Sequence, residues 1–243
     1  MARLVALNSE LHRDIRIDTA GIERQAASLR MVPVMPSEFL KLAIDYPIVL
    51  TKNAETGRFV CAALFGFAEG ENLYWNGDRW QSLYTPLNII RQPFFVGTDE
   101  NSQPLVCIDE DSPCVQRQPG RESTEALFDD EGRGSPYLER MQGVLGQLLD
   151  GEKQSEELVR CLQELELITP MRLEVTFASG DFRRVEGLYT VDEEKLRGLG
   201  GEPLQQLSAA GMLGHIYSML TSLGHIYSLI ERKNAREAAV AES

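Results

Sequence analysis

Short apolar runs separated by polar turns along the first half of the chain predict strands. IVLTKNAETGRFVCAALFGF has two apolar runs around a polar turn that contains Gly57, which is the pattern of a β-hairpin. NLYWNGDRW predicts a second hairpin because Asn76-Gly77 suits a two-residue turn. PFFVGTDENSQPLVCIDE predicts two more strands, and residues 14–17 predict a short one. Strands at hairpin spacing favour a mostly antiparallel sheet.

One helix is expected within this half, at MPSEFLKLAIDYP. Ser37 is the predicted N-cap and Glu38 lies in the first turn. Pro47 ends the helix, because the residue before a proline is pushed out of helical geometry. The predicted inward face consists of Phe39, Leu40, Ala43 and Ile44.

Apolar positions three and four residues apart dominate the second half and predict helices. YLERMQGVLGQLLDG and SEELVRCLQELELI predict two of them, with Ser155 as the cap of the second. MRLEVTFASGDFRRVEGLYTV then predicts a hairpin at residues 171–186, and further helices follow to Lys233. The predicted inward positions of the hairpin are Leu173, Val175 and Phe177 on one strand and Phe182 and Val185 on the other.

A stretch rich in charge and turn formers, from about Asp111 to Pro136, separates these two patterns. The sequence therefore predicts an α+β protein with a β-rich half at residues 1–118 and a helical half with a hairpin at residues 119–243. A chain of 243 residues is also short enough for the two halves to form one integrated domain.

The word LGHIYS occurs twice near the C-terminus and holds His215 and His225. On one continuous helix the two histidines lie about 80° apart in azimuth and about 15 Å apart along the axis, too far to share a metal ion. The repeat instead predicts an apolar seam for the core or for a homodimer. The seam consists of Leu213, Ile216, Leu220, Leu223, Tyr227 and Ile230. His225 is expected on the side away from it, in solvent.

Charge and composition narrow the classes of partner. A net charge of −13 argues against nucleic acid and against anionic lipid surfaces. No apolar run approaches the roughly 18 residues of a membrane span, and the first residues do not read as a secretory signal. The four cysteines lack metal-ligand spacing. We therefore expect a cytoplasmic protein with no cofactor and no metal, while export without a signal peptide stays open.

Two hypotheses compete for the activity. The enzyme hypothesis uses His12 and Asp14, an HxD pair that a distant histidine such as His215 would complete as an iron site. Few residues precede this pair, and the distal histidine lies on a predicted helix, so the signal is weak. No GxSxG elbow is present, and GLGG at residues 198–201 reads as a turn between helices. We favour a binding protein and keep the iron enzyme as an alternative.

A concentration of aromatic residues and arginine at residues 71–95 supports binding. Trp, Tyr and Arg together are typical of interface hot spots, although alternate aromatics also fill the cores of small sheets. The predicted anchors are Trp75, Trp80 and Arg91, with Glu38 and Asp109 as polar partners. Asn72 and His12 complete the predicted binding residues.

Several segments in order resemble the SapC family of bacterial proteins, named after an S-layer-associated protein. They include VPVMPSEF, DYPIVL, IIRQPFF, LVCIDEDS, LFDDEG, VEGLYTVDEEKL and the terminal repeat, and the likeness covers about residues 4–229. None of these motifs is catalytic in kind. Positions that match the family pattern include His12, Glu38, Asn72, Trp80, Arg91 and Asp109.

The resemblance implies an accessory role. Members of this family are described beside TonB-dependent receptors, flavin-dependent halogenase-like proteins and cupin-like proteins. The implied function is a soluble accessory protein that engages a partner protein or peptide around nutrient uptake or partner modification. An S-layer structural component is the remaining alternative, which four cysteines and few Thr/Ser-rich β repeats fit poorly.

Overall fold

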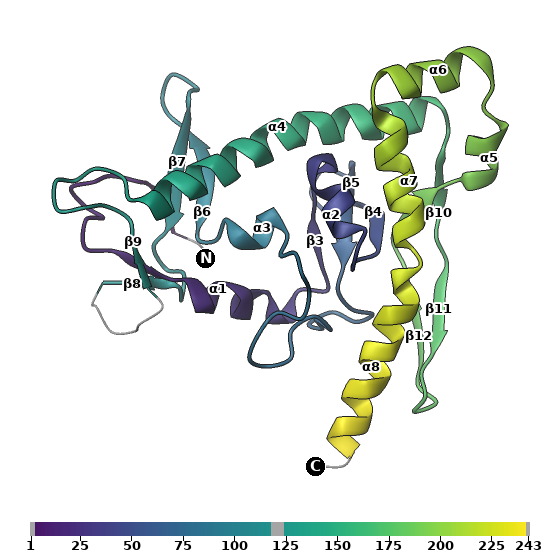
Figure 1. The fold of residues 1–243 in the computed structure, drawn as a ribbon, viewed down its shortest axis with the longest axis horizontal. Helices are drawn as coiled ribbons and strands as arrows, with labels where there is room; N and C mark the ends of the chain where they lie inside the picture. Colours follow the sequence, from purple (N-terminus) through teal and green to yellow (C-terminus); the bar gives the residue numbers. More distant parts are fainter. Residues whose placement is uncertain (1–2, 118–123, 242–243) are drawn as a thin grey trace. The chain divides into compact units, whose positions relative to one another are not determined.

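The computed structural model describes residues 3–117 and 124–241, which form two compact units (Figure 1). The first unit consists of Met1–Ala26, Gly77–Trp80 and Leu87–Asp150. The second consists of Ala27–Asn76, Gln81–Pro86 and Gly151–Ser243. The predicted α+β class is confirmed. The boundary predicted between residues 118 and 119 lies outside the described residues and stays a prediction.

The first unit contains two small antiparallel sheets, with strand orders β1-β7-β6 and β8-β2-β9. Their strands are β1 (Leu4–Ala6), β2 (Arg16–Asp18), β6 (Phe94–Thr98), β7 (Pro104–Asp109), β8 (Val115–Gln116) and β9 (Thr124–Ala126). The predicted hairpin at PFFVGTDENSQPLVCIDE is confirmed as β6 and β7. Helices α1 (Thr19–Gln25) and α3 (Leu87–Ile90) contact each other.

The second unit is built on a five-stranded antiparallel sheet with the order β10-β13-β4-β5-β3. Its strands are β3 (Met31–Pro33), β4 (Ile48–Lys52), β5 (Phe59–Leu64), β10 (Ile168–Pro170) and β13 (Leu188–Val191). A separate hairpin pairs β11 (Leu173–Thr176) with β12 (Phe182–Val185). Helices α5 (Glu193–Gly198) and α6 (Gly201–Ala209) follow β13.

Both hairpins of the second unit were predicted from local turn chemistry. In the β4–β5 turn, Asn53 Oδ1 accepts the backbone N–H groups of Glu55 and Thr56, and Gly57 adopts a φ of +67° that favours glycine. In the β11–β12 hairpin the first predicted inward set is buried. Phe182, an expected inward position, is 55% exposed, because it pairs with the exposed Thr176 on the face opposite to that of Leu173 and Val175.

The helix predicted at MPSEFLKLAIDYP differs from the prediction in its N-cap and in the residues that face the interior. A 3₁₀ turn (Pro36–Glu38) precedes a single α-helical turn, α2 (Phe39–Leu42). Ser37 is not its cap; Glu38 Oε2 accepts the N–H of Met35 at 3.0 Å instead. The tighter 3₁₀ start changes the phase of the helix. Phe39 and Leu42 are therefore fully buried, while the predicted inward residues Leu40 and Ile44 are 76% and 58% exposed.

The two helices predicted on either side of residues 152–154 are one helix, α4 (Pro136–Glu164). Ser155 does not cap a helix, and its Oγ donates to the carbonyl of Gly151 one turn earlier at 2.9 Å. Gly151 is not a terminator either, because it packs against Met35, where a larger side chain would collide.

The C-terminal repeat spans two helices rather than one. Helix α7 (Met212–Ser222) contacts α2 and the sheet strands β4 and β13, and α8 (His225–Ala241) follows after a break at residues 223–224. Ser222 lies at the break: its Oγ donates to Met219 O at 2.6 Å and accepts Ile48 N–H at 2.9 Å. In Figure 1, α8 runs alongside the β11–β12 hairpin, and Asn234 of α8 bonds to Ala178 at its turn.

Residues 71–86, all of which the structure describes, contain no extended strand, and the hairpin predicted at NLYWNGDRW is reduced to single bridge positions at Trp75 and Trp80, with Gln81 N–H donating to Tyr74 O at 2.7 Å. Two backbone carbonyls of this segment accept from a side chain of α8. Arg236 donates to the carbonyls of Asn72 and Trp75 at 2.9 and 2.6 Å. Gly77 has a φ of +102°, so the expected turn is present, flanked by single bridge positions in place of full strands.

An aromatic cluster forms the core beside this segment. The rings of Tyr46, Phe65 and Tyr74 are fully buried, with centroids 4.5 Å apart for the two tyrosines and 5.6 Å apart for Tyr46 and Phe65. Arg232 lies 4.6 Å over the Tyr74 ring. None of the helices in the described part of the chain is long and apolar enough to cross a membrane.

Candidate functional site

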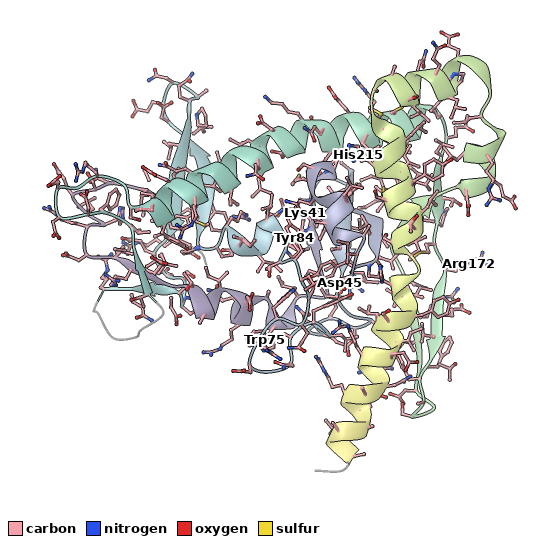
Figure 2. The ribbon with its side chains drawn as sticks, viewed as in Figure 1. Lys41, Asp45, Trp75, Tyr84, Arg172 and His215 are labelled. Carbon is pink, nitrogen blue, oxygen red and sulfur yellow. The ribbon has the colours of Figure 1, made fainter. Side chains whose placement is uncertain are left out.

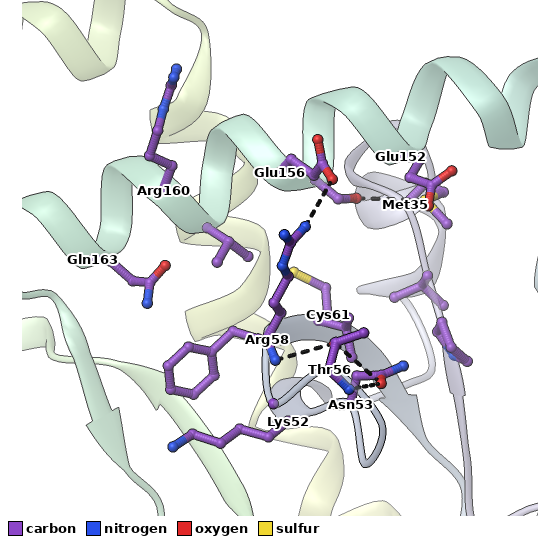
Figure 3. A pocket seen from close by; sticks show the side chains of 17 residues that line it. Met35, Lys52, Asn53, Thr56, Arg58, Cys61, Glu152, Glu156, Arg160 and Gln163 are labelled. Atoms are coloured by element: carbon purple, nitrogen blue, oxygen red, sulfur yellow. Dashed lines mark hydrogen bonds and ion pairs between the residues drawn. The ribbon is translucent and has the colours of Figure 1, made fainter.

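A groove of about 770 Å³ lies in the second unit and is the candidate binding site (Figure 3). One wall is formed by residues 33–35, 52–53 and 56–61, which belong to the end of β3 and the residues after it, the end of β4, the β4–β5 turn and the start of β5. The other wall is one face of α4. Its lining residues on α4 are Glu152, Ser155, Glu156, Val159, Arg160 and Gln163. Their spacing of three and four places them on the same side of the helix.

The close approach of α4 to residue Met35 fixes one end of the groove. Gly151 is buried, and a Cβ built on it would lie 2.7 Å from Met35 Cβ. Only glycine permits this contact without displacement of the chain. Ser155, one turn further along α4, lies with its Oγ 3.5 Å from Met35 Sδ. The two walls are therefore joined at this end by packing.

The floor of the groove is apolar. Val34, Cys61 and Val159 are 1%, 2% and 8% exposed, respectively. Burial raises the pKa of the Cys61 thiol from 9.0 to about 12. At neutral pH this thiol is protonated, and a protonated thiol is neither a nucleophile nor a metal ligand. The floor offers apolar contact rather than reactive chemistry.

The rim of the groove is exposed and charged. Arg58 Nη1 lies 3.9 Å from Glu156 Oε1, so an ion pair joins the two walls. Lys52 Nζ lies 5.2 Å from the ring centroid of Phe59 and 5.6 Å from that of Tyr189, which holds the ammonium by cation–π attraction. Apolar floor and charged rim together are typical of ligand sites that gain affinity from burial and orientation from a few polar groups.

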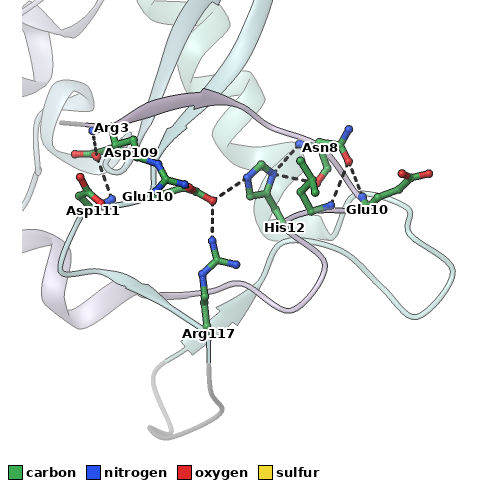
Figure 4. Close-up of polar contacts among 9 residues, drawn as sticks. Arg3, Asn8, Glu10, His12, Asp109, Glu110, Asp111 and Arg117 are labelled. Atoms are coloured by element: carbon green, nitrogen blue, oxygen red, sulfur yellow. Dashed lines mark hydrogen bonds and ion pairs between the residues drawn. The ribbon is translucent and has the colours of Figure 1, made fainter.

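A polar cluster in the first unit surrounds Glu110 (Figure 4). Its carboxylate accepts from Arg3, from Arg117 Nη2 at 2.7 Å and from His12 Nε2 at 3.3 Å. Burial raises the pKa of Glu110, but Arg3, Arg117 and His12 outweigh burial, and the pKa lies below its usual 4.5. Glu110 therefore stays ionised and holds the N-terminal segment against β7 and β8.

The iron hypothesis for His12 and Asp14 gains no support from this cluster. His12 is 2% exposed, and the backbone N–H of Asn8 donates to its Nδ1 at 2.8 Å. Nδ1 also lies 3.0 Å from Asn8 O, and Nε2 lies 3.3 Å from Glu110, so both ring nitrogens already have polar partners within the protein. Among residues 3–117 and 124–241, no three His, Cys, Asp or Glu side chains lie close enough to hold a metal ion.

Three of the predicted binding residues lie in the second unit. Glu38 is 1% exposed and its Oε1 accepts the Tyr84 hydroxyl at 3.0 Å. Asn72 is 1% exposed and its Oδ1 accepts Tyr74 N–H at 2.8 Å. Trp75 is half-buried, in the segment whose carbonyls Arg236 holds (Figure 2). Glu38 and Asn72 organise the interior, and contact of these residues with a partner stays a prediction.

The other predicted anchors lie in the first unit. Trp80 is 7% exposed and its backbone N–H donates to Glu23 at 3.2 Å. Arg91 lies 4.3 Å over the Phe95 ring and donates to Phe94 O at 2.8 Å, and burial lowers its pKa. Asp109 accepts Arg3 N–H at 2.9 Å. Their contact with a partner likewise stays a prediction.

The repeat histidines have structural contacts. His215 packs edge-on against Phe39 with ring centroids 5.8 Å apart. His225 Nε2 lies 2.9 Å from Ala43 O, so its expected place in solvent is wrong, because the break at residues 223–224 rotates α8 relative to α7. Within the predicted seam Ile216 is fully buried, whereas Tyr227 is 76% exposed and outside the core. A homodimer through the remaining face stays a prediction.

The model of the SapC family matches residues 7–229, and the chain therefore belongs to the SapC family. The resemblance of its sequence segments is thereby confirmed. Comparison with curated proteins and with solved structures found no match.

Proposed function

We propose that this SapC-family chain is a non-enzymatic binding protein that holds a segment of a partner protein or peptide in the groove of the second unit. The observation that carries the proposal is the groove itself: about 770 Å³, with a buried apolar floor and an exposed charged rim. This volume lies within the range of roughly 300–1,000 Å³ that is typical of ligand sites.

The shape of the groove favours a chain segment as its ligand. Its walls are a helix face and the rim of a hairpin, and both run for several residues. Residues that line it on α4 begin at Glu152 and end at Gln163, about 16 Å along the helix axis. A groove of this length accommodates about five residues of extended peptide at ~3.3 Å each.

The chemistry of the lining favours binding over catalysis. The floor thiol of Cys61 has its pKa raised to about 12, and the remaining polar lining groups are amides, hydroxyls and the charged side chains at the rim. A general base needs a partner whose proton it removes, and a nucleophile needs an adjacent base. The apolar floor and the charged rim of the groove are instead suited to holding and orienting a ligand.

The family resemblance supplies the proposed context. We place the partner among proteins linked to TonB-dependent nutrient uptake or to a flavin halogenase-like enzyme, and the binding in the cytoplasm. In this proposal the chain presents or protects a partner segment before another protein acts on it.

A peptide-display selection tests the proposal. A random library is selected on the full chain, and the affinities of the recovered peptides are measured by fluorescence anisotropy. Glu156→Trp places a large side chain across the groove, and we expect it to weaken binding at least tenfold. The matched control is Glu157→Trp, an exposed neighbour on α4 that does not line the groove, and it should leave the affinity unchanged.

Two outcomes contradict the proposal. One is a set of recovered peptides that bind the wild-type chain and Glu156→Trp equally well, which places the binding elsewhere. The other is recovery of no peptide above background from the wild-type chain. Circular dichroism of both variants verifies that each is folded before its affinity is compared.

A further inference from the structure

The charges that line the groove change sign along α4. Glu152, Glu156 and Arg160 are exposed and follow one another at intervals of four residues, so they lie on one face of the helix. The face is acidic at Glu152 and basic at Arg160. These two positions are about 12 Å apart along the helix axis.

The facing wall reinforces the basic end. Figure 3 shows Lys52 and Arg160 on opposite walls toward the end of the groove where Gln163 lies, with the Arg160 side chain directed away from Lys52, and Glu152 toward the other end beside Met35. Lys52 is held over Phe59 and Tyr189 by cation–π attraction, so its ammonium stays at this end. The groove thus has a basic end at Lys52 and Arg160 and an acidic end at Glu152.

The pair between Arg58 and Glu156 separates the two ends. Both side chains are well exposed, at 80% and 69%, and their closest atoms are 3.9 Å apart. An exposed pair at this distance is worth at most about 1 kcal/mol and yields easily to a ligand charge. The lining as a whole carries three cationic and two acidic residues on a chain of net charge −13. The basic end is therefore locally distinct from the rest of the protein.

We propose that the groove takes an extended peptide segment with charges of opposite sign about four residues apart. At the basic end a carboxylate of the segment contacts Arg160, with Lys52 on the opposite wall, and a cationic side chain faces Glu152. Four residues of a strand span about 13 Å, which matches the separation of Glu152 and Arg160, and residues four apart point to the same side of a strand. This inference rests on the proposed peptide-binding function and specifies the ligand.

The charge pattern is tested with synthetic peptides on the full chain. The first probe is a capped, fluorescein-labelled peptide with Lys at position 1, Glu at position 5 and Val or Thr between them. The second has Gln at both positions. The third keeps the Lys, has Leu at position 5 and ends there in a free carboxylate. We expect the first or the third to bind at least tenfold more tightly than the second at low salt, and the advantage to shrink with added salt.

Charge reversal on the protein identifies the contact. We expect Arg160→Glu to weaken the better carboxylate peptide at least fivefold and to strengthen a peptide with Lys at both positions. Lys153→Glu carries the same change of charge on an exposed residue of α4 outside the lining, and it should change neither affinity by more than twofold. Tighter binding of the capped Glu peptide assigns the carboxylate to a side chain, and tighter binding of the free-ended peptide assigns it to a chain end.

Failure of this inference is distinguishable from failure of the binding function. Equal affinities of the charged and the Gln peptides, or equal effects of Arg160→Glu and Lys153→Glu, overturn the charge pattern. If Glu156→Trp still weakens the binding of display-selected peptides, the groove is a peptide site with a different specificity. If neither the peptide charges nor Glu156→Trp changes the affinity, the groove is not the binding site.

Discussion

Arg58 and Glu156 form an ion pair that joins the β4–β5 turn to α4, with Nη1 and Oε1 3.9 Å apart. Because the two side chains are 80% and 69% exposed, water screens the pair. The pair lies across the groove without holding its walls together. The walls are instead joined where Met35 packs on Gly151.

Removal of the exposed pair should leave the fold intact. We predict that Arg58→Ala changes the free energy of unfolding by less than about 0.5 kcal/mol, as is usual for exposed ion pairs. Urea unfolding measures it. Arg197→Ala, which removes the exposed pair with Glu193, is the matched control and should behave alike. A loss of more than about 2 kcal/mol for Arg58→Ala alone would show that the pair holds the groove together.

Closure of the groove at its Met35 end depends on the absence of a side chain at residue 151. A Cβ there would lie 2.7 Å from Met35 Cβ and Cγ, so we predict that Gly151→Ala lowers the free energy of unfolding by about 1–3 kcal/mol. Gly143→Ala and Gly146→Ala on the same helix meet no heavy atom within 4 Å. These controls should gain about 0.5–1 kcal/mol from helix propensity. A stabilising Gly151→Ala would contradict the packing of Met35 on α4.

Several elements of the fold follow from local sequence. Asn53 and Gly57 define the turn of the β4–β5 hairpin, and the buried first strand of the β11–β12 hairpin follows from strict alternation. These features depend on residues within a few positions of one another, so a single sequence contains the information.

The groove itself could not be predicted, because its walls come from residues more than ninety positions apart. The first of the two helical segments predicted here ends at Gly151. In the structure Gly151 lies within α4, where Met35 occupies the space that a side chain would need. Likewise the hairpin expected within the aromatic segment at residues 71–95 is reduced to single bridge positions at Trp75 and Trp80, and the binding role of the segment stays a prediction. In this segment Tyr74 O accepts Gln81 N–H, and Arg236 on α8 donates to the carbonyls of Asn72 and Trp75. Hydrogen bonds from a residue so distant in sequence leave no pattern in the segment itself, so the segment alone could not predict them.

Glu110 should make the stability of the chain depend on pH in the acidic range. Its folded-state pKa lies below 4.5 because Arg3, Arg117 and His12 outweigh the opposing effect of burial. The unfolded chain therefore takes up this proton first, and the stabilisation present at neutral pH is lost as the pH falls below about 4.5. We predict that Glu110→Gln costs about 1 kcal/mol at pH 7 and flattens the pH profile in that range. Urea unfolding between pH 3 and pH 7 measures both effects.

Glu10→Gln, an exposed carboxylate of the same unit, is the control for this variant. It should leave the profile below pH 5 as in the wild-type chain. A profile unchanged by Glu110→Gln would mean that the cluster around Glu110 contributes no net stabilisation.

His215 should make the stability of the chain depend on pH in a second range, which is less acidic than that of Glu110. Burial lowers its folded-state pKa below 6.5, so the unfolded chain binds the proton more readily as the pH falls. Stability is then present above about pH 6.5 and declines as the pH falls through the folded-state pKa. We predict that His215→Leu reduces the decline between pH 7 and pH 5, measured as the difference in unfolding free energy. Tyr217→Leu, at a 52% exposed position of α7, should leave the decline unaltered. A steeper decline in His215→Leu would contradict the assigned direction of the pKa shift.

The location of the bound segment is the central claim, and photo-crosslinking measures it most directly. A display-selected peptide that carries a benzophenone side chain is irradiated on the full chain, and the crosslinked residues are identified by mass spectrometry. The account predicts crosslinks within residues 33–35, 52–61 and 152–163, and their loss in Glu156→Trp but not in Glu157→Trp. Crosslinks confined to residues outside these ranges would contradict it.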